Sequence, residues 1–408
     1  MTTVEIPSNE RPALPRGRRI WQVAGLGIGF ALGQGLTFLT QTYLLSQGHT
    51  VLIGEFAVGL GIVTLTQWFA DLGGLNLMSG KHDDHRFVSS VLVARFCAAL
   101  FIVLLTPFCT TWITTPFAQG VVETGRYVAI IWAFNLTGLL DGARRSGQAG
   151  LISFGPWLGC NLATIWIAPT MSFSTGQFVG LGFVIGAVVT VAMQYVIGRD
   201  LLKFVPPNAS DVIAYLRHGG TCALTYATAL TYSRVLLFIV YATCEAATTG
   251  AFAFIRSLIS SLQQALTFVR RTEYPDLVTS SVGGLAKTLR MQSTSIALSG
   301  VIAVGAVCCY PLATLLLPTK DLDIARSAIA FVVTLPFWCV ASALGQQFLA
   351  KHKTQVNFVV IMLGAILSLT LTTCLLTNFG ILAIAFAELT MFVFTFLAYW
   401  FAYRRVFA

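Results

Sequence analysis

The sequence predicts an all-α polytopic membrane protein, on three observations. The 408 residues are 56% hydrophobic and 10% charged, whereas soluble domains carry about 25% charged residues. The chain contains about a dozen apolar stretches near the length of roughly 20 residues that spans a hydrocarbon core. Basic residues also concentrate in every second connector, as the positive-inside rule describes. We therefore expect about 12 transmembrane helices in two six-helix bundles around a central cavity.

Twelve spans, an even number, place both termini on one side of the membrane. Of the 25 Lys and Arg residues, 19 lie in the tails and connectors of that side, and only Arg126, Lys320 and Arg326 lie on the other. This asymmetry predicts cytoplasmic termini, and it explains the net charge of +9 without a nucleic-acid partner. The expected spans are 20–45, 53–77, 87–107, 122–141, 149–169, 176–198, 219–241, 249–269, 291–316, 327–348, 356–376 and 380–402.

The longest polar connector near the midpoint, 199–217, contains the helix-breaking pair Pro206-Pro207. It predicts two halves, 1–204 and 205–408, each with six spans. A short internal echo supports this division. Gly54-Glu55-Phe56-Ala57 opens the second span, and Gly250-Ala251-Phe252-Ala253 opens the eighth. Repeated halves around a site near the membrane midplane are a common plan among transporters.

Three arginines, Arg95, Arg234 and Arg256, lie inside predicted spans. A charge at the bilayer centre costs about 2.5–3.5 kcal/mol on insertion scales, so such residues usually face a wet cavity or a partner. They predict a cationic interior that binds an anionic substrate group. For Arg234 and Arg256 the alternative is that the side chains extend outward to the membrane surface.

Polar residues share one helical face in three spans. This pattern predicts the lining of a hydrated path, and the alternative is hydrogen bonding that holds the helices together. The stripes are Arg256, Ser260, Gln263 and Thr267; Thr64, Gln67 and Asp71; and Thr231, Arg234 and Tyr241. Further candidates for hydrogen bonds to sugars are Gln34, Gln41, Asn135, Asn161, Tyr226 and Tyr232.

Carboxylates are candidates for ion coupling. Glu388 lies mid-span, and Asp71 and Glu55 lie near the ends of the second span. Burial favours the neutral form of a carboxyl group, so Glu388 can take up and release a proton. The alternative is that it neutralises a buried arginine. Arg144 and Arg145 end the fourth span, where Asp141 is a candidate ion-pair partner for them. The two arginines either bind an anionic headgroup or fix the topology.

No cofactor is predicted. The nine cysteines show no metal-site spacing. The segment Lys81-His82-Asp83-Asp84-His85-Arg86 contains metal-ligand residue types, but its place in a short cytoplasmic connector favours a solvated turn. Gly29 and Gly33, and Gly182 and Gly186, form small-xxx-small pairs that predict close helix packing.

The segment 33–95 resembles the Wzx-type polysaccharide flippases, the O-antigen repeat-unit transporters of the multidrug/oligosaccharidyl-lipid/polysaccharide exporter superfamily. The resemblance rests on Tyr43-Leu44-Leu45, Gly54-Glu55-Phe56-Ala57, Ala70-Asp71-Leu72-Gly73 and Arg95 in the third span. The twelve-span plan extends it to the whole chain. Arg95 and Arg256 match candidate cavity cations, and Asp71 matches the acidic end of the second span.

The resemblance implies alternating access in a bacterial inner membrane, coupled to H⁺ or Na⁺ and without ATP. The implied substrate is a polyprenyl-diphosphate-linked oligosaccharide that moves from the cytoplasmic to the outer leaflet during lipopolysaccharide O-antigen biosynthesis. The implied partners are this glycan, membrane lipid, a polysaccharide polymerase and a chain-length regulator.

Two alternatives stay open from the sequence. A multidrug or organic-ion antiporter of the same superfamily would favour carboxylates over arginines in its cavity. A membrane glycosyltransferase or polymerase needs titratable groups within reach of its substrate, and the longest outer connector, 108–121, contains no Asp, Glu, His, Lys or Arg. We therefore expect a transporter and not an enzyme.

Overall fold

The computed structural model describes residues 16–167, 171–279, 285–316, 319–350 and 353–406, in which every regular element is an α-helix. Seven of the described helices are long and apolar enough to cross a membrane. All the expected spans coincide with helices, three of them broken, so the prediction of an all-α polytopic membrane protein is confirmed. The first ten helices are α1 (Arg16–Ser46), α2 (Thr50–Asp71), α3 (Gly74–Gly80), α4 (His85–Thr110), α5 (Pro116–Gly125), α6 (Val128–Trp132), α7 (Thr137–Gly142), α8 (Ser146–Ile152), α9 (Gly155–Ile167) and α10 (Phe173–Gly198).

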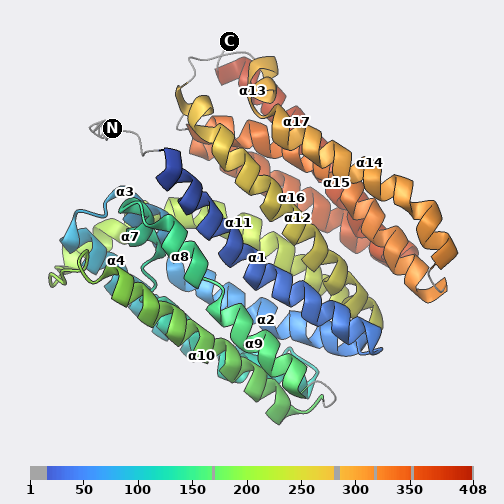
Figure 1. Cartoon of the computed structure of the whole chain (residues 1–408), viewed down its shortest axis with the longest axis horizontal. Coiled ribbons are helices and arrows are strands. Elements are labelled where there is room, and N and C mark those ends of the chain that lie inside the picture. Colours follow the sequence, from blue (N-terminus) through green and yellow to red (C-terminus); the bar gives the residue numbers. More distant parts are fainter. Residues whose placement is uncertain (1–15, 168–170, 280–284, 317–318, 351–352, 407–408) are drawn as a thin grey trace.

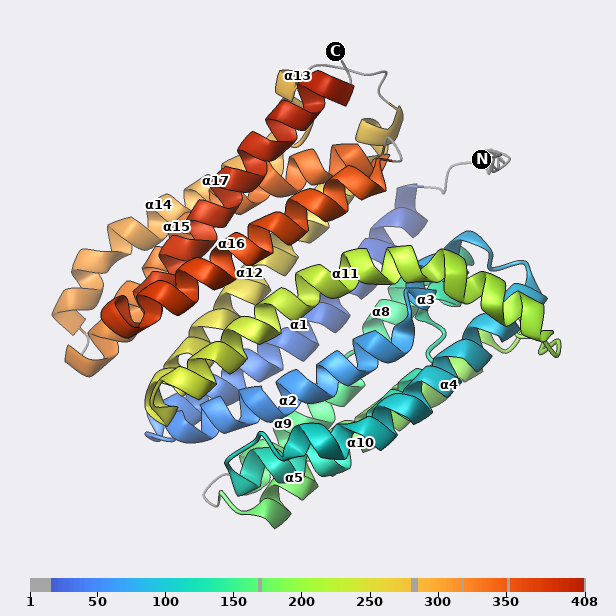
Figure 2. The ribbon, with the colours of Figure 1, turned by 180° about the vertical axis from the view of Figure 1, so that it is seen from behind.

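The remaining helices form the other side of the molecule (Figure 1). Helix α11 contacts α2 and α4 as well as α12 and α16, so it links the two groups of helices, and the boundary between residues 204 and 205 stays a prediction. Figure 2 shows it crossing from α4 toward α12. These helices are α11 (Ala209–Thr243), α12 (Ala246–Thr279), α13 (Leu285–Met291), α14 (Ser293–Leu316), α15 (Thr319–Ala350), α16 (Thr354–Phe379) and α17 (Ile381–Val406).

Helix α1 begins and α17 ends at the same end of the molecule (Figures 1 and 2). We call this the basic end, because Lys81, Arg86 and Arg145 lie in or beside its connectors. The α1–α2 and α11–α12 turns lie at the other end, which we call the distal end. Both termini of the described chain are thus on one side, as an even number of crossings requires.

Three predicted spans are not continuous helices. The second ends at Asp71, because Leu72 and Gly73 adopt left-handed φ angles of 48° and 72°; α3 then continues to Gly80. The fourth is divided into α5, α6 and α7, and the fifth into α8 and α9. Periodicity alone did not show these breaks.

Side chains compensate the break between α6 and α7. The amide of Leu136 donates to Gln194 Oε1 at 2.8 Å, and the amide of Thr137 donates to Asn135 Oδ1 at 2.8 Å. Asn135 is 1% exposed. Irregular backbone at membrane depth is tolerated where it is buried in protein and its polar groups find partners, and both conditions hold here.

Glycines allow close contacts between α1 and α8 and between α9 and α10. A Cβ atom at Gly29 would lie 1.9 Å from the carbonyl oxygen of Gly150, and one at Gly186 would lie 2.1 Å from that of Gly155. Any side chain would therefore separate α1 from α8, or α10 from α9. The prediction of close packing at these glycines is confirmed.

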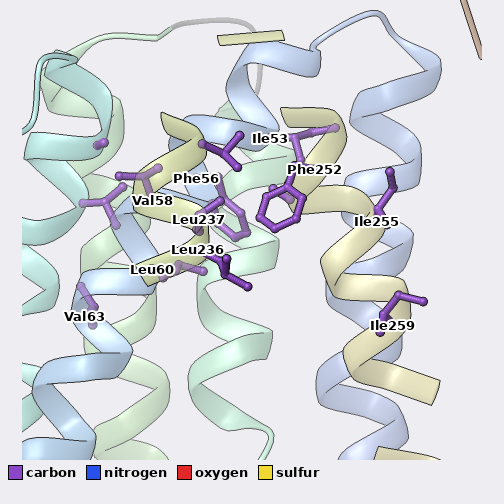
Figure 3. Packing of buried hydrophobic residues seen from close by; sticks show 14 of the residues in the cluster. Ile53, Phe56, Val58, Leu60, Val63, Leu236, Leu237, Phe252, Ile255 and Ile259 are labelled. Atoms are coloured by element: carbon purple, nitrogen blue, oxygen red, sulfur yellow. The ribbon is translucent and has the colours of Figure 1, made fainter. Parts of the chain in front are cut away.

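The largest buried apolar cluster joins α2, α11 and α12 (Figure 3). The two similar segments, 54–57 and 250–253, pack against each other in this cluster. A Cβ at Gly54 would lie 3.0 Å from the backbone nitrogen of Gly250, and Phe56 and Phe252 are 1% and 0% exposed. Phe38 of α1 also stacks on Phe254 of α12, with ring centroids 5.6 Å apart. The distal ends of α2 and α12 are therefore in tight contact.

Candidate functional site

A charged cluster lies among α11, α12, α16 and α17. Arg256 of α12 donates to Glu388 Oε1 of α17 at 2.6 Å. Tyr232 of α11 lies beside this pair, and its hydroxyl is 2.6 Å from Ser368 Oγ of α16. We call these four residues the Arg256 cluster. It brings together two residues that sequence analysis assigned to different roles, substrate binding for Arg256 and ion coupling for Glu388.

The two charged groups of this cluster differ in accessibility. The side chain of Arg256 is 19% exposed, whereas that of Glu388 is 1% exposed. Glu388 Oε2 is buried, and it accepts no hydrogen bond from any part of the chain that the structure describes. A buried carboxylate oxygen without a donor is costly, so the pair is held but incompletely satisfied. Glu388 Oε2 therefore remains available to a further donor or to a cation.

Arg234 lies two residues after Tyr232 of the cluster on α11. Its Cδ packs 3.8 Å from the position that a Cβ of Gly61 would take, so the side chain lies at the α2–α11 contact. Its charge is close enough to Arg256 to interact with it. The described residues provide Arg234 with neither an ion pair nor a hydrogen bond. Arg256 and Arg234 thus interact with each other, and only Arg256 is paired with a carboxylate among the described residues, which leaves an excess of positive charge.

The polar stripes lie on the same central helices. Ser260 and Gln263 are partly exposed on α12, on the face that carries Arg256. Gln67 of α2 is 7% exposed, and its Nε2 finds no acceptor among the described residues. The buried Oε1 of Gln41 on α1 accepts no hydrogen bond from the described residues. These unsatisfied amides are consistent with contacts to a molecule other than the protein.

Arg95 lies in a different place from Arg234 and Arg256. It forms an ion pair with Asp71, donates to the carbonyl oxygen of Asn135 at 2.9 Å and lies 3.8 Å from the sulfur of Met78. It is 0% exposed. Asp71 and the broken backbone between α6 and α7 occupy the charge of Arg95 in this structure, and the expectation that Arg95 binds an anionic substrate group stays a prediction.

The other two predicted coupling carboxylates also have partners of their own. Asp71, besides Arg95, accepts from the amide of Leu75 at 3.2 Å, which connects α2 to α3. Glu55, near the distal end, accepts a hydrogen bond from the hydroxyl of Thr115, at the start of α5. Neither carboxylate belongs to the Arg256 cluster, so the structure divides the predicted coupling residues among three locations.

Arg144 and Arg145 lie at the basic end. Arg145 binds Asp200 in a bidentate pair, with N–O distances of 2.8 and 2.5 Å, and donates to the carbonyl of Ile197 at 2.6 Å. This hydrogen bonding holds the pKa of Asp200 below its usual value. Asp141 was the expected partner of Arg144 and Arg145, whereas the ion pair of Arg145 is with Asp200. The Gln22 side chain donates to the carbonyl of Arg144, which has a left-handed φ of 60°.

One buried cation, Arg270, was not predicted from the sequence. Arg270 was assigned to a cytoplasmic connector, but α12 continues past it to Thr279, and the residue is 3% exposed. Its guanidinium lies 4.2 Å from the ring centroid of Trp338 on α15. Ser368 was also missed, because a single serine in an apolar span gives no signal until α16 is placed against α11.

Two cavities lie away from the Arg256 cluster. One, of about 320 Å³, lies at the basic end between α4 and α11 and is lined by Lys81, Arg86 and Asp211, among others. There Arg86 Nε pairs with Asp211 at 2.9 Å. The other, of about 590 Å³, is an apolar groove between α2, α4 and α11.

The remaining sequence candidates are dispersed. Asn161 donates to Thr37 of α1 at 3.0 Å and so serves helix packing. The side chain of Tyr226 lies outside the described residues. In the His82–His85 loop, His82 Nε2 lies 3.2 Å from Asp83. The described part of the chain contains no group of three or more His, Cys, Asp and Glu residues that could hold a metal.

Comparison with known proteins shows the fold. No protein-family model and no curated protein sequence matches the chain. The structure is similar to a ligand complex of the MATE multidrug transporter DinF-BH, with a TM-score of 0.66 at 12% identity over 97% of both chains. It is similar to the lipid II flippase MurJ in an inward closed conformation, with a TM-score of 0.62 at 14% identity over 93% of this chain and 87% of that one. A MOP-superfamily transporter from Pyrococcus furiosus gives 0.53 at 13% identity, over 97% and 98%. The chain therefore has the fold of the MOP-superfamily transporters.

Proposed function

We propose that the protein is a flippase that moves a polyprenyl-diphosphate-linked oligosaccharide repeat unit from the cytoplasmic to the outer leaflet. The observation that carries this proposal is the Arg256 cluster with Arg234 beside it. Two guanidinium groups and one buried carboxylate leave a net positive charge inside the helical assembly. Guanidinium groups bind diphosphate oxygens in bidentate geometry, so an anionic headgroup is the chemistry that this site favours.

Ion coupling follows from competition for Arg256. While Glu388 is charged, it holds Arg256 through Oε1. When Glu388 takes up a proton or binds a cation, that attraction weakens and Arg256 becomes available to the diphosphate. Release of the ion restores the pair and expels the substrate. The 19% exposure of Arg256 makes this exchange possible without first opening the protein core.

Similarity of fold supports the proposal without selecting the substrate. MurJ is a flippase of lipid II, whereas DinF-BH is a multidrug transporter. The second candidate function is therefore a multidrug or organic-ion antiporter. The carboxylate Glu388 favours it, but the excess of arginine around that carboxylate favours an anion.

The biological setting is part of the same proposal. A bacterial inner membrane, cytoplasmic termini at the basic end and two halves at 1–204 and 205–408 fit the distribution of Lys and Arg. We assign the glycan to O-antigen biosynthesis, with the polymerase and chain-length regulator as partners, on the resemblance of segment 33–95 alone.

A leaflet-exchange assay tests the function. Proteoliposomes would contain a fluorescent polyprenyl diphosphate disaccharide, and a membrane-impermeant quencher would report the fraction that reaches the other leaflet. We expect exchange by the wild type, a loss of at least tenfold in Arg256→Ala, and partial activity in Arg256→Lys, which keeps the charge but loses the bidentate geometry.

The control is Arg326→Ala, an exposed arginine of α15 outside the cluster, which should retain full exchange. A parallel arm would measure uptake of ethidium, a cationic fluorescent dye. Movement of ethidium by wild-type protein that does not exchange the diphosphate lipid would establish the antiporter instead, and full diphosphate exchange by Arg256→Ala would remove this residue from the mechanism.

A further inference from the structure

The apolar groove lies along the contact between the two halves. It has a volume of about 590 Å³, with walls from α2, α4 and α11. Its residues on α2 and on α11 are spaced at helical intervals, so each helix presents one continuous face to it. Leu105 and Phe69 are 44% and 47% exposed, so the groove opens on the outside of the protein. Since α2 and α4 are candidate membrane spans, that outside is the hydrocarbon core.

The groove offers its occupant almost no polar atoms. Thr66 and Thr106 line it, but their hydroxyls donate to backbone carbonyls of their own helices, each at 2.7 Å. Tyr241 directs its hydroxyl to Thr114, 2.9 Å away at the distal end. The three hydroxyl groups are thus satisfied by protein, and the indole N–H of Trp112 is the remaining side-chain donor in the lining, so the space favours a hydrocarbon chain.

The inner margin of the groove carries a charge. Arg234 lies four residues before Phe238 and seven before Tyr241, so it shares the face of α11 that lines the groove. Gly61 of α2 confirms the proximity, because its Cβ position would touch both Phe238 and Arg234, each at 3.8 Å. The groove therefore leads from bilayer hydrocarbon to a cation.

The depth of Arg234 in the membrane distinguishes two lipids whose hydrocarbon chain could fill the groove, a bulk phospholipid and a lipid with its headgroup inside the protein. Arg234 lies nine residues from the end of α11 at Thr243, which is about 13 Å at 1.5 Å per residue, within a hydrocarbon core of about 30 Å. The headgroup of a bulk phospholipid stays at the membrane surface, so it does not reach this arginine. A lipid whose anionic headgroup is inside the protein does.

We propose that the groove between α2, α4 and α11 holds the polyprenyl chain of the transported lipid while Arg234 contacts its diphosphate. This inference rests on the proposed function and adds to it a lateral path for the lipid tail. The tail stays in hydrocarbon throughout, and only the headgroup passes among the polar residues of the central helices.

Site-specific photocrosslinking tests the groove. Benzoylphenylalanine would replace Leu105, which lines it, or Leu104, which is 72% exposed on the same helix and does not. In liposomes of phosphatidylethanolamine and phosphatidylglycerol containing tritiated polyprenyl diphosphate, we expect at least fivefold more label at position 105. Arg234→Ala should reduce that label, and unlabelled polyprenyl diphosphate should displace it.

Two results would overturn the proposal: more label at position 104, as exposure to bulk lipid alone would give, or displacement by excess phosphatidylglycerol as effective as that by polyprenyl diphosphate.

A groove-filling variant separates this inference from the function. Ala242→Phe places a ring in the groove from an exposed position, and Thr243→Phe, its exposed neighbour outside the groove, is the control. We expect leaflet exchange to fall at least fivefold in the first variant only. Wild-type exchange by Ala242→Phe, together with its loss in Arg256→Ala, would overturn the groove and leave the proposed function intact. Absence of exchange in the wild type would overturn both.

Discussion

Two buried arginine–carboxylate pairs in the described part of the chain are chemically alike but differ in accessibility. In the pair between α4 and α2, Arg95 is 0% exposed and binds both Asp71 and the carbonyl of Asn135. In the pair between α12 and α17, Arg256 keeps 19% of its side chain exposed, and Glu388 keeps one oxygen without a donor among the described residues. The first pair closes a break in the helices, whereas the second retains capacity to bind something else.

The comparison teaches that a charge inside a span is not by itself evidence of a binding site. An arginine at membrane depth must find compensation, and the protein supplies Arg95 with a carboxylate and a backbone carbonyl, which leaves only its Nε without a partner among the described residues. Arg95 finds its compensation at the end of α2 and at the non-helical turn between α6 and α7. What distinguishes Arg256 is its accessibility, with 19% of its side chain exposed, together with Arg234 nearby, to which the described residues offer no counter-ion.

The largest effect should follow from breaking the first pair. Arg95→Ala leaves Asp71 buried without its counter-charge, and the loss of one partner of such a pair costs about 3–5 kcal/mol. We expect a marked fall in the thermal unfolding temperature of the purified protein, larger than that in Arg256→Ala, because Arg95 also holds the carbonyl of Asn135.

The double substitution Arg95→Met with Asp71→Leu removes both charges and should recover much of this loss. An unfolding temperature of Arg95→Ala equal to that of the wild type would show that the pair is not structural, and would return Arg95 to the set of candidate substrate contacts.

An intermediate effect is expected on the coupling of leaflet exchange to an ion gradient. Glu388→Gln keeps the shape of the side chain but removes its charge, so Arg256 is no longer held by an ion pair. We expect leaflet exchange to continue while its stimulation by an imposed H⁺ or Na⁺ gradient disappears. Asp71→Asn is the matched control in the other pair and should keep the stimulation. Gradient dependence retained by Glu388→Gln and lost by Asp71→Asn would reverse the roles assigned to the two pairs.

The smallest effect is expected for the exposed ion pair Arg145–Asp200, which serves as the reference for the two buried pairs. Arg145 lowers the pKa of Asp200, so its stabilisation is present above the unfolded-state pKa and is lost as the pH falls through the lower, folded-state value. Asp200→Asn should lower the unfolding temperature slightly at neutral pH, and the difference from the wild type should vanish in acid. A difference that grows as the pH falls would contradict this sign.

Much of the fold follows from patterns that lie within single segments. Hydropathy located the apolar spans, and the alternation of charged connectors predicted that both termini lie on one side. The small-residue pairs at Gly29 and Gly186 predicted close packing correctly, but not that Gly150 and Gly155 are the residues they contact. The breaks at Leu72 and Asn135 were missed, because their compensation comes from Tyr215, Gln194 and Arg95 on other helices.

The candidate site shows the same division. The sequence by itself determined that charged residues lie at membrane depth. Because burying a charge there is costly, Arg95, Arg234, Arg256 and Glu388 could be recognised as candidate functional residues. Only the tertiary structure decided which charge neutralises which, because ion pairing depends on distances between helices that are far apart in the chain. Arg256 and Glu388 are 132 residues apart and in direct contact, and no local pattern contains that information.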